Sequence, residues 1–121
     1  MKTFVALTAA VLALSTTGVL AADPDAGAKV FKNQCTACHS NVAGKKLVGP
    51  SLFGIVGRKA GTQDFAYSDA NKNSGITWDE ATLEQYLVAP GKMVVGTKMT
   101  YAGLKNDTQR ADLIAYLATL K

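Results

Sequence analysis

Five consecutive residues, Cys35-Thr36-Ala37-Cys38-His39, constrain this chain more than any other feature. At the end of a helix, the cysteines would be three residues apart and Cys35 and His39 four apart, so all three side chains would leave one face. Two thiols placed in this way can form thioethers to one edge of a porphyrin, while the imidazole points at its iron. This C-x-x-C-H pentad therefore predicts covalent attachment of a c-type haem.

The same cysteines could instead form a structural disulfide, a redox-active dithiol or half of a zinc site. Zinc needs four protein ligands, or three and a water, but the only two cysteines and the only histidine of the chain all lie in the pentad. A thioredoxin-like dithiol needs alternating strands and helices, and no strand pattern matches the strength of the helical ones. Haem is the preferred interpretation, and free thiols in a mass measurement would favour the dithiol.

The N-terminal residues are typical of a secretory signal peptide. Lys2 supplies a positive start, residues 4–14 form an apolar run too short to span a membrane comfortably, and Ala21 and Ala22 are small residues suited to cleavage. An uncleaved membrane anchor is the alternative, which the polar residues after the apolar run disfavour. We expect cleavage after Ala21 or Ala22 and export to a bacterial periplasm.

Removal of residues 1–22 as a signal peptide leaves residues 23–121 as one domain. Because Lys2 is lost, twelve basic residues remain against nine acidic ones, and the formal net charge falls from +4 to +3. The domain lacks the dense Lys/Arg run of a nucleic-acid binder. An acidic protein partner fits better, and we expect no nucleic-acid partner and a monomer.

Two main helices are predicted at the ends of this domain. The first begins with Asp23 as N-cap and Pro24 at the first helical position and runs about to the pentad, with Gly27 interpreted as a place where another helix crosses closely. The last begins near Asn106 or Asp107 and runs to the C-terminus. Its apolar stripe has helical spacing and consists of Leu113, Ile114, Leu117 and Leu120, with Tyr116 beside it.

A third main helix is predicted by a capping box, with Thr77 as N-cap and Glu80 at the third helical position. This helix must stop before Pro90. A short helix is expected over residues 68–72.

Long loops separate these helices. Residues 40–62 contain five glycines, and residues 90–105 contain three more, so both stretches are predicted to be irregular. Loops of this length in a compact domain are usually functional or wrapped around something. The predicted fold class is all-α, with three main helices, a short one and long loops wrapped around one covalent haem.

A haem held by His39 has a second axial position, whose occupant decides between electron transfer and ligand chemistry. Methionine is the candidate, and Met93 and Met99 remain once Met1 is lost with the signal peptide. Met99 lies in a loop sixty residues from His39 and can reach the opposite haem face. Met93 is interpreted as core filler.

These features together resemble the class I cytochromes c, in particular the mitochondrial-like type found in bacterial periplasms. The resemblance covers nearly all of residues 23–121. It is carried by Gly27 and Phe31, the pentad, residues 49–54, Gly57-Arg58, residues 67–78, residues 96–99 and residues 112–117.

The resemblance implies a role for each matching site residue. Cys35 and Cys38 would carry the thioethers, His39 and Met99 would be the axial ligands, and the Pro50 carbonyl would orient His39 through its other ring nitrogen.

By the same resemblance, Tyr67 and Trp78 would hydrogen-bond a buried haem propionate, with the charge of Arg58 nearby. Trp78 and Tyr86 could instead fill core, and Arg58 could be a solvated charge. The resemblance assigns a polar network on the methionine side to three further residues, Asn71, Tyr86 and Thr97.

The function that the resemblance implies is a soluble electron carrier and not an enzyme. Its redox partners would be proteins such as a membrane quinol-oxidising complex and a terminal oxidase, reductase or reaction centre. The competing class is an enzyme or ligand binder in which Met99 leaves the iron. Candidate docking charges are five lysines, Lys32, Lys45, Lys46, Lys92 and Lys98, whose alternative role is ordinary solubility.

Two positions depart from the family pattern. Val95 replaces a proline that usually precedes residues 96–99, and loss of that rigid residue should enlarge the unfolded ensemble of the loop. We therefore expect Met99 to detach more readily than in close relatives. Gln34 replaces a lysine that many relatives place before the first cysteine, which weakens the predicted docking charge.

Overall fold

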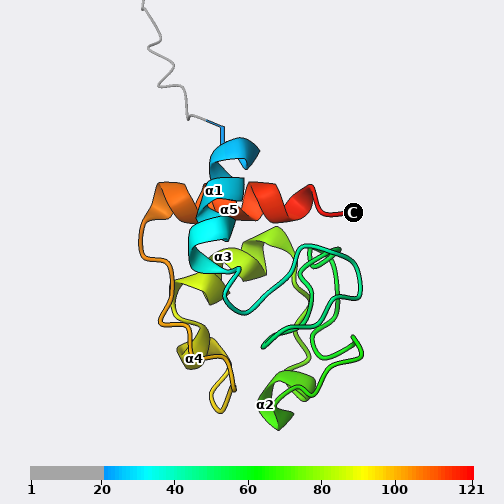
Figure 1. The fold of residues 1–121 in the computed structure, drawn as a ribbon. Coiled ribbons are helices and arrows are strands. Elements are labelled where there is room, and N and C mark those ends of the chain that lie inside the picture. Colours follow the sequence, from blue (N-terminus) through cyan, green and yellow to red (C-terminus); the bar gives the residue numbers. More distant parts are fainter. Residues whose placement is uncertain (1–20) are drawn as a thin grey trace, which may run out of the picture.

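The computed structural model describes residues 21–121, which form five helices, most of them joined by long loops (Figure 1). All but the last two residues of the predicted signal peptide lie outside the described residues. Within residues 21–121 no helix has both the length and the apolar composition needed to cross a bilayer. The helices are α1 (Pro24–Gln34), α2 (Asp69–Lys72), α3 (Glu80–Val88), α4 (Pro90–Met93) and α5 (Asp107–Ala118).

The all-α prediction is confirmed, because the described chain contains no strand and only an isolated bridge between Lys59 and Thr77. The predicted start of α1 is also confirmed. The Asp23 carboxylate accepts a hydrogen bond from the Asp25 backbone N–H at 2.9 Å, and Pro24 follows at the first helical position. The side chain of Asn106 caps α5 in the same way.

The predicted capping box at Thr77 is wrong. The N-cap of α3 is Asp79, whose carboxylate accepts a hydrogen bond from the Thr82 N–H at 2.7 Å, and the helix begins at Glu80. Thr77 is instead paired with Lys59 across the isolated bridge. The next residue, Trp78, is also held by this loop: its N–H donates to the Arg58 carbonyl and its carbonyl accepts from the Gly57 N–H, both at 2.8 Å. The helix therefore cannot begin directly after Thr77.

The prediction that residues 90–105 are all loop is partly wrong. α3 ends at Val88, as Pro90 required, but Pro90 then begins the short helix α4. Proline suits the first turn of a helix, where its missing N–H has no intrahelical partner to lose. The Val94 N–H donates to the Pro90 carbonyl at 2.9 Å and ends this turn.

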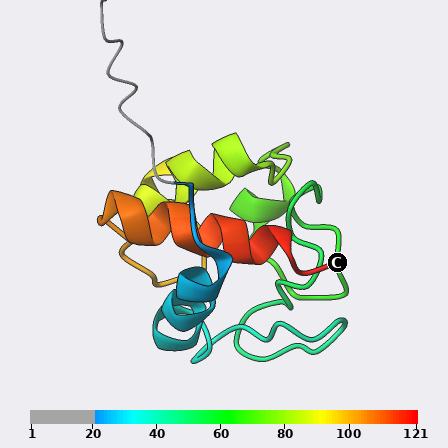
Figure 2. The same ribbon diagram turned by 90° about the horizontal axis from the view of Figure 1, so that it is seen from above.

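α5 packs against both α1 and α3. Seen from above, it lies between these two helices (Figure 2). At the crossing with α1, a Cβ atom on Gly27 would collide with the Asp112 backbone carbonyl and lie 2.8 Å from the Tyr116 Cβ. The close helix crossing predicted at Gly27 is therefore confirmed. Beside it, the rings of Phe31 and Tyr116 pack with centroids 5.3 Å apart.

We expect Gly27→Ala to lower the free energy of unfolding by about 1–3 kcal/mol, because overpacking at the crossing exceeds the ~1 kcal/mol that alanine gains over glycine within a helix. Chemical denaturation would measure the change. Gly91→Ala in α4 is the matched control, since no atom lies within 4 Å of the added Cβ. Equal stability of Gly27→Ala and the unmodified protein would contradict a tight crossing.

Candidate functional site

One cavity of about 330 Å³ brings together all the side chains assigned above to a cofactor. Its walls come from the end of α1, the loops on either side of α2, helices α3 and α5, and the segment after α4. The predicted site residues that line it are Cys35, Cys38, His39, Pro50, Arg58, Tyr67, Asn71, Trp78, Tyr86, Thr97 and Met99.

The pentad reaches this cavity from a single turn. α1 ends at Gln34, but the Cys35 N–H still donates to the Phe31 carbonyl at 2.8 Å, and the His39 N–H donates to the Cys35 carbonyl at 2.9 Å. The chain therefore keeps turning, and all three reactive side chains of the pentad line the cavity. The thiols of Cys35 and Cys38 are not joined to each other.

The His39 ring is held from behind by Pro50. Its Nδ1 lies 2.7 Å from the Pro50 carbonyl oxygen, and because a carbonyl can only accept, Nδ1 carries the proton and Nε2 keeps its lone pair. Burial lowers the pKa of His39, against the opposing effect of the Pro50 hydrogen bond. The imidazole is therefore neutral at neutral pH, which is the form that binds metals.

Gly49 makes room for this ring, a role that the sequence analysis did not assign. A Cβ atom at Gly49 would lie 2.7 Å from the His39 Nδ1, so only glycine lets the backbone pass so close. In the sequence, the signal is a glycine directly before Pro50. It indicates a close approach to the His39 ring only once the His39–Pro50 contact is known.

Met99 is held by two neighbours. The Tyr86 hydroxyl donates to the Met99 Sδ at 3.1 Å, and the Met99 N–H donates to the Thr97 Oγ1 at 3.2 Å. Burial raises the pKa of Tyr86 to about 12, so its hydroxyl stays protonated and remains a donor. The rings of Tyr86 and Trp78 pack with centroids 4.5 Å apart, which fixes the direction of that hydroxyl.

Arg58 is fastened to the cavity wall by backbone carbonyls. Its guanidinium donates to the Ser51 carbonyl at 3.1 Å and also to the Phe53 carbonyl. Burial lowers its pKa, while the nearby Tyr67 acts in the opposite direction. Tyr67 accepts a hydrogen bond from the Gln63 N–H at 3.2 Å. The positive charge is therefore fixed beside the cavity and does not swing freely in solvent.

Asn71 gives independent evidence that the cavity receives a polar group. Its side-chain oxygen is buried and has no hydrogen-bond partner among the described residues, while the residue lines the cavity. Such atoms are few in native proteins and call for an explanation, such as a partner bound from outside the chain. The lining thus combines an apolar surface with polar groups directed at one occupant.

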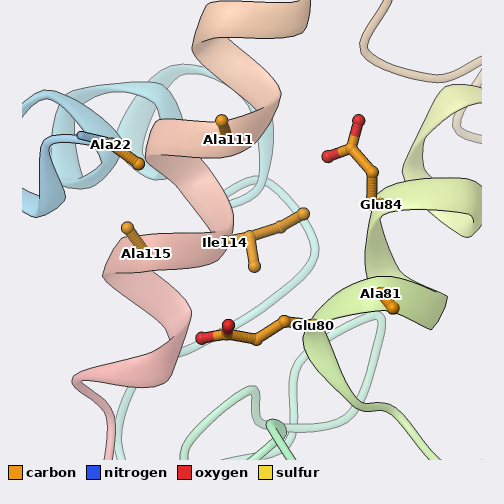
Figure 3. A pocket seen from close by; sticks show the side chains of 7 residues that line it. All are labelled: Ala22, Glu80, Ala81, Glu84, Ala111, Ile114 and Ala115. Atoms are coloured by element: carbon orange, nitrogen blue, oxygen red, sulfur yellow. The ribbon is translucent and has the colours of Figure 1, made fainter. Parts of the chain in front are cut away.

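A second hollow, of about 340 Å³, lies between α3 and α5 (Figure 3). Its volume is about that of the first cavity, so the chemistry of the lining must distinguish the two. The second hollow has neither sulfur nor imidazole in its wall, which consists of Ala22, Glu80, Ala81, Glu84, Ala111, Ile114 and Ala115.

The zinc alternative gains no support from the geometry. Across residues 21–121, no group of three His, Cys, Asp or Glu side chains is close enough to hold a metal ion together. The donors of the first cavity are instead one imidazole, one thioether and two thiols, a set that fits a covalently attached haem.

Comparisons with known proteins agree with this donor set. A family model described as Cytochrome c matches residues 24–121. Cytochrome c2 of Rhodoblastus acidophilus is 58% identical over 103 residues, covering 84% of this chain and 95% of that protein. Cytochrome c of Theileria annulata is 57% identical over 96 residues, covering 78% of this chain and 84% of that protein.

A solved structure, cytochrome cH from Methylobacterium extorquens, shares 48% sequence identity and superposes with a TM-score of 0.76. The match covers 80% of this chain and 98% of that one. The similarity therefore extends over the fold as well as the pentad, and Cys35 and Cys38 have the spacing at which this family attaches its haem. The chain belongs to the cytochrome c family, whose members are electron-transfer proteins with a covalently bound haem c.

Proposed function

We propose that this protein is a periplasmic electron carrier in which His39 and Met99 are the two axial ligands of the haem iron. The observation that carries the proposal is that both residues line one cavity and each is held by a hydrogen bond. Pro50 holds the His39 ring at 2.7 Å, and Tyr86 holds the Met99 sulfur at 3.1 Å. Ligands fixed in this way need little rearrangement when the charge of a bound metal changes.

When bound, the haem supplies a reversible one-electron change at its iron, with a potential that His/Met ligation raises. The chain fixes the position and the protonation of the groups that face the cofactor. Pro50 keeps the proton on the His39 Nδ1, so Nε2 is the ligating atom. Tyr86 stays protonated beside Met99 and keeps the sulfur directed into the cavity.

Met99→Ala tests the ligation. We expect the ferric protein to lose the methionine-to-iron charge-transfer band and to bind imidazole at least about tenfold more tightly, since no side chain competes for the open position. Met93→Ala is the matched control, because Met93 is not the core filler that the sequence predicted: it is 36% exposed in α4 and does not line the cavity. Visible spectra in both oxidation states would measure both effects. Absence of the band from the unmodified protein would refute the ligand assignment.

The hydrophobic core is built around the cofactor cavity. Within residues 21–121, eleven apolar residues are buried in the core, and seven of them also line the cavity. An apolar body bound there would therefore give these buried side chains the packing partner that an empty cavity lacks, and unfilled cavity volume destabilises by about 24 cal/mol per Å³. The seven shared residues are Ile55, Trp78, Leu83, Tyr86, Leu87, Leu113 and Leu117.

The chain produced without haem should consequently lack fixed tertiary packing. We expect its near-UV circular dichroism and the dispersion of its amide resonances to collapse, with loss of a cooperative thermal transition. The haem-loaded protein is the reference. Native-like dispersion in the haem-free chain would show that its apolar core is sufficient alone.

The proposed partners are membrane-bound or soluble redox proteins with acidic docking faces, such as a quinol-oxidising complex as donor and an oxidase, reductase or reaction centre as acceptor. All five candidate docking lysines are exposed, and Lys98 also lies at the cavity wall. Lys46 is ion-paired with Asp64 at 2.9 Å, which reduces the charge it offers. Lys98 is thus the best-placed member of the set.

We expect electron transfer to an acidic redox protein to slow as ionic strength rises, because exposed charges are screened beyond about 8 Å at physiological salt. Lys98→Gln should lower the second-order rate constant at low salt by up to about fivefold, equivalent to ~1 kcal/mol for one charge pair in water. Lys29→Gln, an exposed α1 residue outside the cavity lining, should change it less. Stopped-flow rates that do not vary with salt would contradict docking through these lysines.

A further inference from the structure

One side-chain hydrogen bond joins the two chain segments that supply the proposed iron ligands. The Tyr101 hydroxyl donates to the Gln34 Oε1 at 3.0 Å, between residues 67 positions apart in the sequence. Gln34 directly precedes Cys35, and Tyr101 lies two residues after Met99. The bond therefore connects the residue before the pentad to the chain segment that carries Met99. Both bonded residues line the cavity.

The methionine segment, residues 98–102, has few other attachments. In the described part of the chain, its backbone makes no hydrogen bond to another backbone group. On the N-terminal side, the Tyr86 hydroxyl and Thr97 contact Met99, and on the C-terminal side Lys105 donates to the Ala102 carbonyl. Only the Tyr101 hydroxyl connects residues 98–102 to α1 by a hydrogen bond.

The partner of Tyr101 is anchored on a rigid element. Gln34 is the last residue of α1 and lies within the turn closed by the bond from the Cys35 N–H to the Phe31 carbonyl at 2.8 Å. Phe31 is 3% exposed and packs at the α1–α5 crossing. A hydrogen bond to Gln34 therefore restrains a sparsely bonded segment against a fixed part of the fold.

We propose that Gln34 and Tyr101 are positioning residues that keep Met99 on the iron by fastening its segment to the pentad. The proposal rests on the His39/Met99 ligation proposed above. The bond is made only while residues 99–101 lie against the end of α1, so it stabilises the ligated arrangement and is lost when the segment moves away. Neither residue contacts the iron; each acts through the position of Met99.

Displacement of Met99 by imidazole in the ferric holoprotein tests this pair. We expect Tyr101→Phe and Gln34→Leu each to tighten apparent imidazole binding about two- to tenfold, the range for loss of one hydrogen bond. The methionine charge-transfer band should persist without imidazole. The double variant should match either single variant, because both remove one shared interaction.

Tyr116→Phe is the matched control. The Tyr116 hydroxyl accepts a hydrogen bond from the Asn41 side chain at 2.9 Å, an exposed bond of similar kind that does not involve residues 98–102. Its loss should leave imidazole affinity unchanged. Unchanged affinity in Tyr101→Phe and Gln34→Leu, or additive effects in the double variant, would overturn the pairing while leaving His/Met ligation intact. Absence of the charge-transfer band from the unmodified protein would refute the ligation, and the positioning role with it.

Discussion

Where α1 crosses α5, the backbones meet so closely that Gly27 has no room for a side chain beside the Asp112 carbonyl. The Asp23 N–H also donates to the Asp112 carboxylate at 2.8 Å, which ties the start of α1 to α5. Because the pentad follows directly after α1, this crossing fixes where the cysteines and His39 enter the cavity. α5 packs on α3 as well, and α3 carries Tyr86, so the same helix relates the histidine side to the methionine side.

The polar groups of the cavity complement this apolar framework. Pro50 and Tyr86 each make one hydrogen bond to a proposed ligand. Burial raises the pKa of Tyr86, so its hydroxyl remains a donor, and lowers the pKa of His39 against the effect of the Pro50 bond, so Nε2 keeps its lone pair. Within a protein interior such bonds are stronger than in water, and an unpaired group is correspondingly costly. The buried oxygen of Asn71, unpaired within the described chain, is consistent with a lining completed by its cofactor.

The division of the core between protein and cofactor explains why so small a domain can have such long loops. Residues 40–62 contain no helix, yet Leu52 and Ile55 from this stretch line the cavity. Both belong to or pack against the core cluster, and the occupant of the cavity would be a further packing partner. Loop segments of this kind have fixed positions only when something fills the space they surround.

The sequence by itself determined the features that depend on neighbours along the chain. Spacing within the pentad identified the cofactor, Asp23 and Pro24 identified the start of α1, and composition left few candidates for the second ligand.

Tertiary structure decided what depends on distant contacts. Thr77 has the local signature of an N-cap, but its pairing with Lys59 keeps the chain in a loop until Asp79. Two further contacts also join residues that are not neighbours along the chain. Gly49 lies against the His39 ring, and the Tyr101 hydroxyl donates to Gln34. No periodicity or capping rule encodes such contacts, because they arise only when the folded chain brings the two segments together.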